Sequence, residues 1–576
     1  MKYRTSLAPL AVAALIASLP LLGRAATSAQ PSAASIPTPE PSPVVPAVPA
    51  VSPGYSATNA PPASADIVGV TQQPFVGLSL HDAIGMALLK NTDLSVSSAN
   101  ARIATYQVRA ARGAYDLRFV VEPSVDHSTS APQNAFFSGP GFTPIVQNRQ
   151  SVQAGVQGQT TNGGQYKVDI TQTRVDDNTI INAFNPYYLA SLNVSLSQPL
   201  LKGARAGNDT VRQLLLAQAG AANSQAGAFV SASQVISNVS NTYWDLLAQW
   251  RNVAIQEDAL HQAILQQQSN VRLAKRGAAA PIDAVESSTQ VAIYQDNVYS
   301  ALGAVARLQN ELKSLVVNDP ADPIWQANLV PTSPALQVPA VPALSTILEN
   351  AMQHRPELRQ IAAAQSQADV NLRYAKNQLL PGVDLQLNYQ GNGFAGNALP
   401  PFSFIPGQPG LPPPSYLGGT YDQAYGNIGK FPAYQAGVVI SAPFGNTTAK
   451  ANLAAAQEQE RIAKIQASGL DQRIVFEVRN ALQAYQTALS RLYAARKARD
   501  AAAAVYASEE RRFRNGESTT FLVFARQVEL VQDEGRELQA QTDLNKSIVE
   551  LQRVDGTILS SNDVTLSTTG RGAGTP

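Results

Sequence analysis

Residues 478–492 read VRNALQAYQTALSRL, and their apolar side chains decide the fold. The apolar positions are separated by four, three, four and three residues: Val478, Leu482, Tyr485, Leu489 and Leu492. This spacing puts them on one side of a helix and is typical of a helix that packs lengthwise against its neighbours.

The helix predicted around this stretch is unusually long. No proline interrupts the chain between Asn446 and Pro576. The distance from Pro443 to Gly516 is 73 positions, which corresponds to a helix of about 100 Å at about 1.5 Å per residue. The segment Arg512–Ser518 then forms a turn, and a second helical run returns to Leu559. Such a hairpin suits a tube or a stalk rather than an ordinary globular domain.

Composition excludes several classes of function. The net charge of +1 and the 14% of charged residues leave no basic stripe for a nucleic acid. The chain has no cysteine, which excludes disulfides and thiolate metal sites. The four histidines are scattered without ligand spacing: His81, His127, His261 and His354. We find no Ser/His/Asp grouping, so we expect no enzyme, no catalytic residue, no cofactor and no bound metal.

The N-terminal part of the chain predicts export. Residues 1–29 combine Lys2 and Arg4, an apolar core and small residues before position 30, as in a signal peptide. A single membrane-anchoring helix is the alternative, but the apolar core is short and contains Pro20. Residues 30–77 are rich in proline and alanine and are expected to form a disordered arm.

Four segments show the alternation of apolar and polar residues that predicts β-strands: 117–128, 151–160, 165–174 and 189–198. Membrane-barrel strands alternate in this way. Strands of a soluble β-sandwich do so as well, so each segment alone does not distinguish the two.

The element order occurs twice, which indicates a tandem duplication. The offset is constant, because Leu358 follows Leu94 and Arg373 follows Arg109 by 264 positions each. The first repeat spans 78–317, with a helix, strands within 117–198 and a long hairpin at 209–317. A proline-rich connector at 318–343 leads to the second repeat at 344–559, with strands within 383–441 and a hairpin at 446–559. Residues 560–576 form a C-terminal tail.

Too few strands are present in one chain to close a barrel, and its helices cannot bury all their apolar surfaces. Association with further copies satisfies both. The motifs Leu-Ser-Leu (78–80), Ser-Gln-Pro-Leu-Leu-Lys-Gly (197–203), Thr-Tyr-Trp-Asp-Leu-Leu (242–247) and Arg-Leu-Ala-Lys-Arg-Gly (272–277), in an order that recurs after the connector, resemble the TolC-like outer membrane efflux family. The resemblance covers residues 78–559.

The resemblance implies an α+β membrane protein: a homotrimer with a β-barrel in the outer membrane that continues into a long periplasmic α-helical barrel. It also implies the partners, which are a periplasmic adaptor (membrane fusion protein), an inner-membrane transporter and outer membrane lipid. The arm at 30–77 would then lie in the periplasm. Channels of this family are passive and export small molecules or secreted polypeptides with energy from those partners.

The resemblance further implies that the turns between the long helices contact the adaptor: Arg276, Gly277 and Ala278 in the first repeat, and Asn515, Gly516 and Glu517 in the second. Apart from the two glycines, these residues depart from the family pattern, which puts the choice of adaptor in doubt. The alternative is that both glycines only terminate helices.

The periplasmic gate implied by the resemblance lies just after these turns. Asp283 falls on a family carboxylate position, but Leu522 and Ala525 replace the two carboxylates of the second repeat. Ser518 replaces the gate arginine, whereas Phe513 keeps the aromatic character beside it. Our hypothesis is an apolar constriction formed by Phe521 or Leu522 with one carboxylate ring from Asp283; the alternative for Asp283 is a helix cap after Pro281.

Two questions stay open at this point. The strand pair within 151–174 exceeds the two strands per repeat of the family, so it either widens the barrel from twelve to eighteen strands or forms a flap outside the membrane. Two other kinds of protein are alternatives: a trimeric coiled-coil surface stalk or adhesin, which explains the heptads and the export signal, and the periplasmic adaptor itself, which also has long hairpins. The stalk leaves the strands unexplained, and an adaptor carries one hairpin rather than a duplication.

Overall fold

The computed structural model describes residues 74–564 except 133–134, 140, 337, 339, 341–342, 402 and 404–407. The predicted signal peptide at 1–29 and most of the predicted arm and tail lie outside these residues. Among the described helices, none combines the length and the hydropathy needed to cross a bilayer.

The same order of elements occurs twice, as the duplication predicts. The first copy consists of α1 (Leu80–Lys90), α2 (Thr92–Arg112), β2 (Arg118–Ser130), β3 (Ile145–Gln159), β4 (Gln165–Asp177), β5 (Phe184–Pro199), α4 (Asp209–Lys275) and α5 (Pro281–Val316). The second consists of α6 (Leu344–His354), α7 (Pro356–Gln378), β7 (Gly382–Ala398), β8 (Phe431–Ser441), α9 (Thr447–Arg514) and α10 (Thr520–Val554). The two longest helices have matching lengths, 67 residues in α4 and 68 in α9.

Several boundaries differ from those expected. The first helix of each repeat is two helices, because Asn91 and Arg355 have extended backbones between them. Arg355 precedes Pro356, and a residue before proline disfavours the helical conformation. Strand β1 (Phe75–Leu78) occupies the end of the predicted arm and pairs in parallel with β6 (Asn328–Pro331) inside the predicted connector. The tail begins with a short 3-10 helix at Ser560–Asn562.

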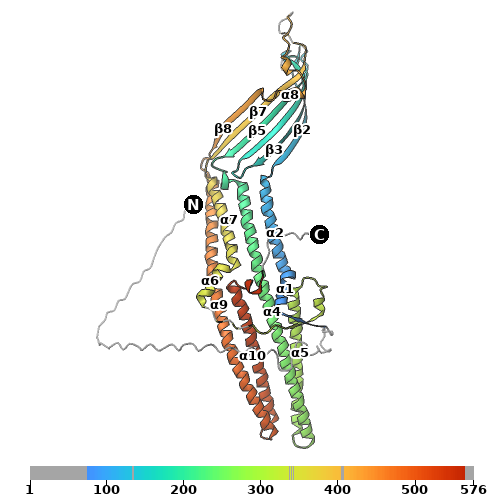
Figure 1. The fold of residues 1–576 in the computed structure, drawn as a ribbon, viewed down its shortest axis with the longest axis vertical. Coiled ribbons are helices and arrows are strands. Elements are labelled where there is room, and N and C mark those ends of the chain that lie inside the picture. The colour runs from blue at the N-terminus through green and yellow to red at the C-terminus, as the bar shows by residue number, and fades with distance from the viewer. Residues whose placement is uncertain are drawn as a thin grey trace, which may run out of the picture. The chain divides into compact units, whose positions relative to one another are not determined.

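Six strands form one antiparallel sheet in the order β2-β3-β4-β5-β7-β8 (Figure 1). Strands from both repeats therefore share a single sheet, joined where β5 pairs with β7. The pair β3–β4 lies between β2 and β5, so the extra strands predicted from the sequence are part of the sheet rather than a separate flap.

The two faces of the sheet differ in polarity. One set of register partners, here called the apolar row, crosses all six strands: Phe119, Val156, Val168, Val194, Tyr389 and Tyr434. The neighbouring set, here called the polar row, points to the opposite face: Arg118, Gln157, Lys167, Ser195, Asn388 and Gln435. Successive side chains of a strand point to opposite faces, so one face is apolar and the other polar.

A short helix, α8 (Tyr421–Gly426), covers part of the apolar face at the end of the sheet far from the long helices (Figure 1). The ring of Tyr421 packs edge-on against Tyr188, with ring centroids 4.6 Å apart. Gly393 permits this approach, because a Cβ at that position would lie 2.0 Å from the carbonyl oxygen of Ala424. The exposed part of the apolar face therefore ends at α8.

The helices form two rows of four that share α4 and α9. Next to the sheet, α4 contacts α2 and α7, and α7 contacts α9, which gives the order α2-α4-α7-α9. Toward the turns, α4 contacts α5 and α10, and α10 contacts α9, which gives the order α5-α4-α10-α9 (Figure 1). At the exchange between the two rows, α2 and α7 are replaced by α5 and α10 as the neighbours of α4 and α9. Helices α4 and α9 continue through both rows.

The main apolar core lies at this exchange. Tyr243, Trp244 and Trp250 of α4 are almost completely buried there. The Tyr243 hydroxyl donates to the carbonyl of Leu78 in β1 and accepts from the Ser333 N–H, each at 2.9 Å. The indole N–H of Trp250 donates to the Leu329 carbonyl in β6 at 2.9 Å. These bonds fasten the β1–β6 pair to α4.

The substitution Tyr243→Phe tests this connection. It keeps the buried ring but leaves the carbonyl of Leu78 and the N–H of Ser333 without the hydroxyl, which should lower the free energy of unfolding by about 1–3 kcal/mol. Urea unfolding of the detergent-solubilised protein, followed by circular dichroism, measures this loss. Tyr106→Phe in α2 is the control, because that tyrosine is exposed; equal effects of the two substitutions would contradict the assignment.

Candidate functional site

The two turns between long helices have the same geometry. Gly277 and Gly516 adopt positive φ values of 72° and 80°. In each turn the residue after the glycine donates its N–H to a carbonyl five residues earlier, from Ala278 to Leu273 at 2.9 Å and from Glu517 to Arg512 at 2.9 Å. This is a Schellman motif, which requires glycine or asparagine at the left-handed position.

The predicted adaptor-contact residues all lie exposed on these turns: Arg276, Gly277, Ala278, Asn515, Gly516 and Glu517. Space around both glycines is open, since a Cβ at either position would have no neighbour within 4 Å. The turns therefore have the geometry of helix ends and are also accessible. Their contact with an adaptor stays a prediction.

Asp283 sits in the first turn of α5, three residues after Ala280. Its Oδ2 accepts the Ala280 N–H at 3.2 Å, and its own N–H donates to the Ala280 carbonyl at 3.1 Å. This arrangement caps the helix, and the side chain remains half-buried. The carboxylate is therefore held in a fixed direction by its own turn.

The other predicted gate residues lie on the α9–α10 hairpin. Phe521, Leu522 and Ala525 form one exposed face of α10, and the Phe521 side chain is 68% exposed. Phe513 at the end of α9 and Ser518 in the turn are half-buried. Asp283 and this apolar face thus belong to different hairpins of the chain.

The partner of Ser518 is a residue that the sequence did not reveal. The Ser518 hydroxyl donates to Oε1 of Glu509, and Arg512 lies 3.5 Å from Oε2 of the same carboxylate. Glu509 is a charged residue that is only 8% exposed. The position expected to carry a gate arginine therefore ties the turn to its own helix. Ser518 and Glu509 meet only because the chain turns between them, and no helical periodicity in the sequence predicts their contact.

Further bonds join the two hairpins above the turns. The buried Gln527 side chain in α10 donates to the Ala259 carbonyl of α4 at 3.0 Å. The Tyr506 hydroxyl in α9 donates to Oε1 of Gln262 in α4 at 3.2 Å. Both contacts connect the second-repeat hairpin to α4 within one chain, so they restrain any separation of the hairpins.

Carboxylates lie in this same part of the bundle. Burial, with a contribution from neighbouring Asp258, raises the pKa of Glu257 in α4 to about 7. Burial also raises the pKa of Glu534 in α10, where the positive charge of Arg499 opposes the effect. The lower bundle therefore holds one carboxyl group, that of Glu257, whose pKa lies near neutral pH, and a second, that of Glu534, whose pKa is also raised.

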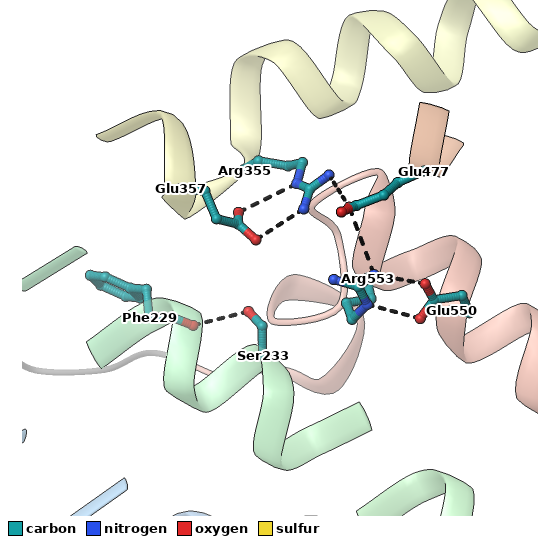
Figure 2. A network of polar contacts seen from close by, with 7 residues as sticks. All are labelled: Phe229, Ser233, Arg355, Glu357, Glu477, Glu550 and Arg553. Carbon is teal, nitrogen blue, oxygen red and sulfur yellow. Dashed lines mark hydrogen bonds and ion pairs between the residues drawn. The ribbon is translucent and has the colours of Figure 1, made fainter. Parts of the chain in front are cut away.

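A second charged cluster lies at the exchange between the helix rows (Figure 2). Arg355, 3% exposed, binds both carboxylate oxygens of Glu357 at 3.3 and 3.0 Å and Glu477 of α9 at 2.7 Å. Arg553 of α10 binds Glu550 and lies 3.8 Å from Glu477. The cluster joins the α6–α7 break to α9 and α10.

The electrostatics of the pair Arg355–Glu357 favour the charged forms. Burial alone would raise the pKa of Glu357, but the Arg355 guanidinium outweighs it and lowers that pKa. Burial would likewise lower the pKa of Arg355, and its two carboxylate partners raise it instead. The ion pair therefore stays intact at neutral pH.

The same position in the first repeat is occupied by a neutral residue. Asn91 lies 264 positions before Arg355 and is 5% exposed. Its side chain accepts the Leu94 N–H at 3.1 Å and donates to the Leu315 carbonyl at 3.0 Å. One amide thus satisfies the start of α2 and the end of α5, whereas the second repeat uses an ion-pair cluster.

Replacement of Arg355 by glutamine should destabilise the helix junction. Glu357 then loses its counter-ion in a largely buried site, and Glu477 keeps only the more distant Arg553, which together costs about 3 kcal/mol. Thermal unfolding in detergent measures the loss. The difference from the wild type should narrow as the pH falls through the lowered pKa of Glu357, because protonation removes the charge that Arg355 stabilises.

The control is Arg461→Gln, because Arg461 pairs with Glu458 on an open surface where both side chains are about two-thirds exposed. Such pairs contribute about 0–1 kcal/mol. An Arg355 variant as stable as the Arg461 variant would show that the cluster does not hold the junction.

The raised pKa of Glu257 predicts a pH dependence of stability. A carboxyl group whose pKa is higher in the folded state stabilises the fold at low pH, and this contribution is lost as the pH rises through about 7. Stability should therefore decrease between about pH 5 and about pH 7, and Glu257→Gln should reduce that slope. Melting temperatures at the two pH values check this; Glu529→Gln, on the exposed side of α10, should leave the slope unchanged.

Comparisons with known proteins agree with this geometry. A protein-family profile described as outer membrane efflux protein matches residues 347–557. Among solved structures, the Campylobacter jejuni CmeC outer membrane channel is 15% identical, with 83% of this chain and 86% of that chain covered and a TM-score of 0.57. The outer membrane protein VceC of Vibrio cholerae is 14% identical, with coverage of 83% and 96% and a TM-score of 0.56.

The open state of the Neisseria gonorrhoeae MtrE outer membrane channel is also similar, at 18% identity, with coverage of 83% and 89% and a TM-score of 0.53. No curated protein matches in sequence. Residues 347–557 therefore match the outer membrane efflux protein family, and the chain as a whole has the fold of the outer membrane channels to which it is similar.

Proposed function

We propose that three copies of this chain form a passive channel that exports small molecules or secreted polypeptides across the periplasm and the outer membrane. An inner-membrane transporter and a periplasmic adaptor supply the energy and the connection to the inner membrane. The open edges of the chain are the observation that carries this proposal.

The sheet has two unpaired edges. In the described sheet β2 pairs with β3 and β8 with β7, which leaves one side of each edge strand without a ladder. Unpaired edges of long strands are unstable unless another strand covers them. Since β2 leads away from α2 and β8 leads toward α9, the edges of two neighbouring copies are antiparallel and can continue the ladder.

The helix rows end at the same two sides of the chain. Exposed apolar residues lie on the outer helices: Val96, Ile103 and Tyr106 on α2, and Ile462, Ile465 and Phe476 on α9. Apolar surface of this extent marks an interface. If α2 of one copy contacts α9 of the next, β2 of the first copy can pair with β8 of the next at the same interface. The same interface then closes both the ring of strands and the ring of helices. Three is the number of copies that the family resemblance implies.

The faces of the sheet fit this arrangement. In a closed ring the apolar row faces lipid and the polar row faces the lumen, as expected for a channel filled with water. A surface stalk needs no such sheet. An adaptor would carry a single hairpin, whereas this chain has two, both ending in exposed glycine turns that are suited to contact an adaptor.

The gate hypothesis sets the first experiment. Single-channel recordings of the purified protein in planar bilayers should give small, cation-selective currents, because three Asp283 carboxylates converge at the narrow end. Asp283→Asn should reduce the cation selectivity while its side-chain oxygen still caps α5. Leu522→Ala should raise the conductance by widening the apolar constriction.

Glu517→Gln is the matched control, because it removes the same charge from an exposed turn outside the predicted constriction. Selectivity that survives in Asp283→Asn would reduce Asp283 to a helix cap and leave the channel intact. Folded protein that produces no current at all would contradict the channel and favour the surface stalk.

A further inference from the structure

The hairpin β3–β4 makes this sheet wider than two strands per repeat would. From its place in the sheet we infer that the trimer closes an eighteen-stranded barrel, so that the exit through the outer membrane is as wide as the helical tube beneath it. This inference rests on the proposed trimeric channel.

The pairing shows that the hairpin is inserted into the sheet rather than laid over it. Thirteen consecutive register pairs join β2 to β3, from Arg118–Gln157 to Ser130–Ile145, and β4 continues from Gln165 alongside β5. Strand β2 is thereby separated from β5 by both strands of the hairpin. A flap outside the barrel would leave β2 and β5 paired with each other.

The side chains of the hairpin follow the two-faced pattern of the whole sheet. Val156 and Val168 continue the apolar row between Phe119 of β2 and Val194 of β5. Gln157 and Lys167 continue the polar row on the opposite face. A hairpin surrounded by water has no need of valines at these positions, whereas a hairpin in the membrane wall requires them.

Polar contacts fasten the hairpin on the lumen face. Asp169 of β4 accepts hydrogen bonds from Gln153 of β3 and Asn193 of β5, each at 2.8 Å. Thr171 donates to the same carboxylate at 3.2 Å. The Asp169 side chain is only 4% exposed. One carboxylate thus links three neighbouring strands, which holds the hairpin in line with β5.

The circumference of the strand barrel then agrees with that of the helical tube. Three six-stranded sheets give eighteen strands, and at about 4.8 Å per strand and a tilt of about 40° they enclose a circumference of about 110 Å. Three rows of four helices at about 9 Å between axes also give about 110 Å. Without the hairpin the same arithmetic gives a barrel of about 75 Å. The hairpin therefore lets the barrel continue the tube without a step, and barrels of this strand number enclose an aqueous channel.

Single cysteines test the inference, since the chain has none of its own. Val156→Cys and Gln157→Cys probe the hairpin, and Val194→Cys and Ser195→Cys are the matched controls in β5, the neighbouring strand. Each variant is labelled with an environment-sensitive fluorophore and reconstituted in liposomes. Quenchers carried on lipid chains and dissolved iodide then report which side each position faces.

We expect lipid quenching at positions 156 and 194, and iodide quenching at 157 and 195, to comparable extents in the two strands. Lipid quenching at 194 together with iodide quenching alone at 156 would overturn the eighteen-stranded barrel and leave the channel standing. The absence of lipid quenching at 194 would instead overturn the proposed membrane channel itself.

A measurement on the unmodified protein guards against variants that fail to assemble. Electron microscopy of trimers in lipid nanodiscs should show a barrel with a circumference of about 110 Å. A circumference of about 75 Å would place the hairpin outside the wall and overturn the inference.

Discussion

The exchange of neighbours between the two helix rows is the constraint on which the rest of the structure depends. Helices α4 and α9 run through both rows, but α2 and α7 end where α5 and α10 arrive. Each ending exposes backbone groups that have no partner inside the helix. In the middle of a packed bundle these groups must be satisfied by side chains, and the buried residues Asn91 and Arg355 lie at these helix ends.

The two repeats solve this problem with different chemistry. Asn91 serves two helix ends with one neutral amide, whereas Arg355 draws together Glu357 and Glu477. The first repeat adds the β1–β6 pair, which Tyr243 and Trp250 attach to α4. An ion-pair cluster loses its strength when a carboxylate is protonated, but an amide does not, so the contacts of Arg355 are sensitive to acid and those of Asn91 are not.

The sequence predicted the repeated architecture because periodicity and offset are local properties of the chain. The spacing of Val478 to Leu492 indicated the long helix, and the offset of 264 aligned the repeats. The breaks at Asn91 and Arg355 were missed, although Pro356 marked one of them. The bond between Ser518 and Glu509 and the contact of Gln527 with Ala259 depend on how a turn or two hairpins come together. No periodic pattern records such contacts.

The bonds that join the two hairpins lie away from the turns themselves. Ser518 is engaged with Glu509 of its own hairpin, so it offers no link to the other hairpin. The bonds that do join the hairpins, from Gln527 and Tyr506 to α4, lie further along the bundle. Glu257 and Glu534 are half-buried in the same region, where burial raises the pKa of both carboxyl groups. The two hairpins are therefore joined over a length of helix rather than at one point.

The width of the proposed barrel affects where exported molecules can be selected. If the barrel continues the helical tube at the same circumference, the wall of the outer membrane part offers charged, amide and hydroxyl groups but no narrowing. Any selection among exported molecules must then occur at the opposite end, where the proposed constriction of Phe521, Leu522 and Asp283 would lie. Since those side chains lie on hairpins that α4 restrains, the width of the narrow end depends on contacts some distance above it. In the proposed channel, separating the second-repeat hairpin from α4 would therefore require breaking the contacts of Gln527 and Tyr506 with α4.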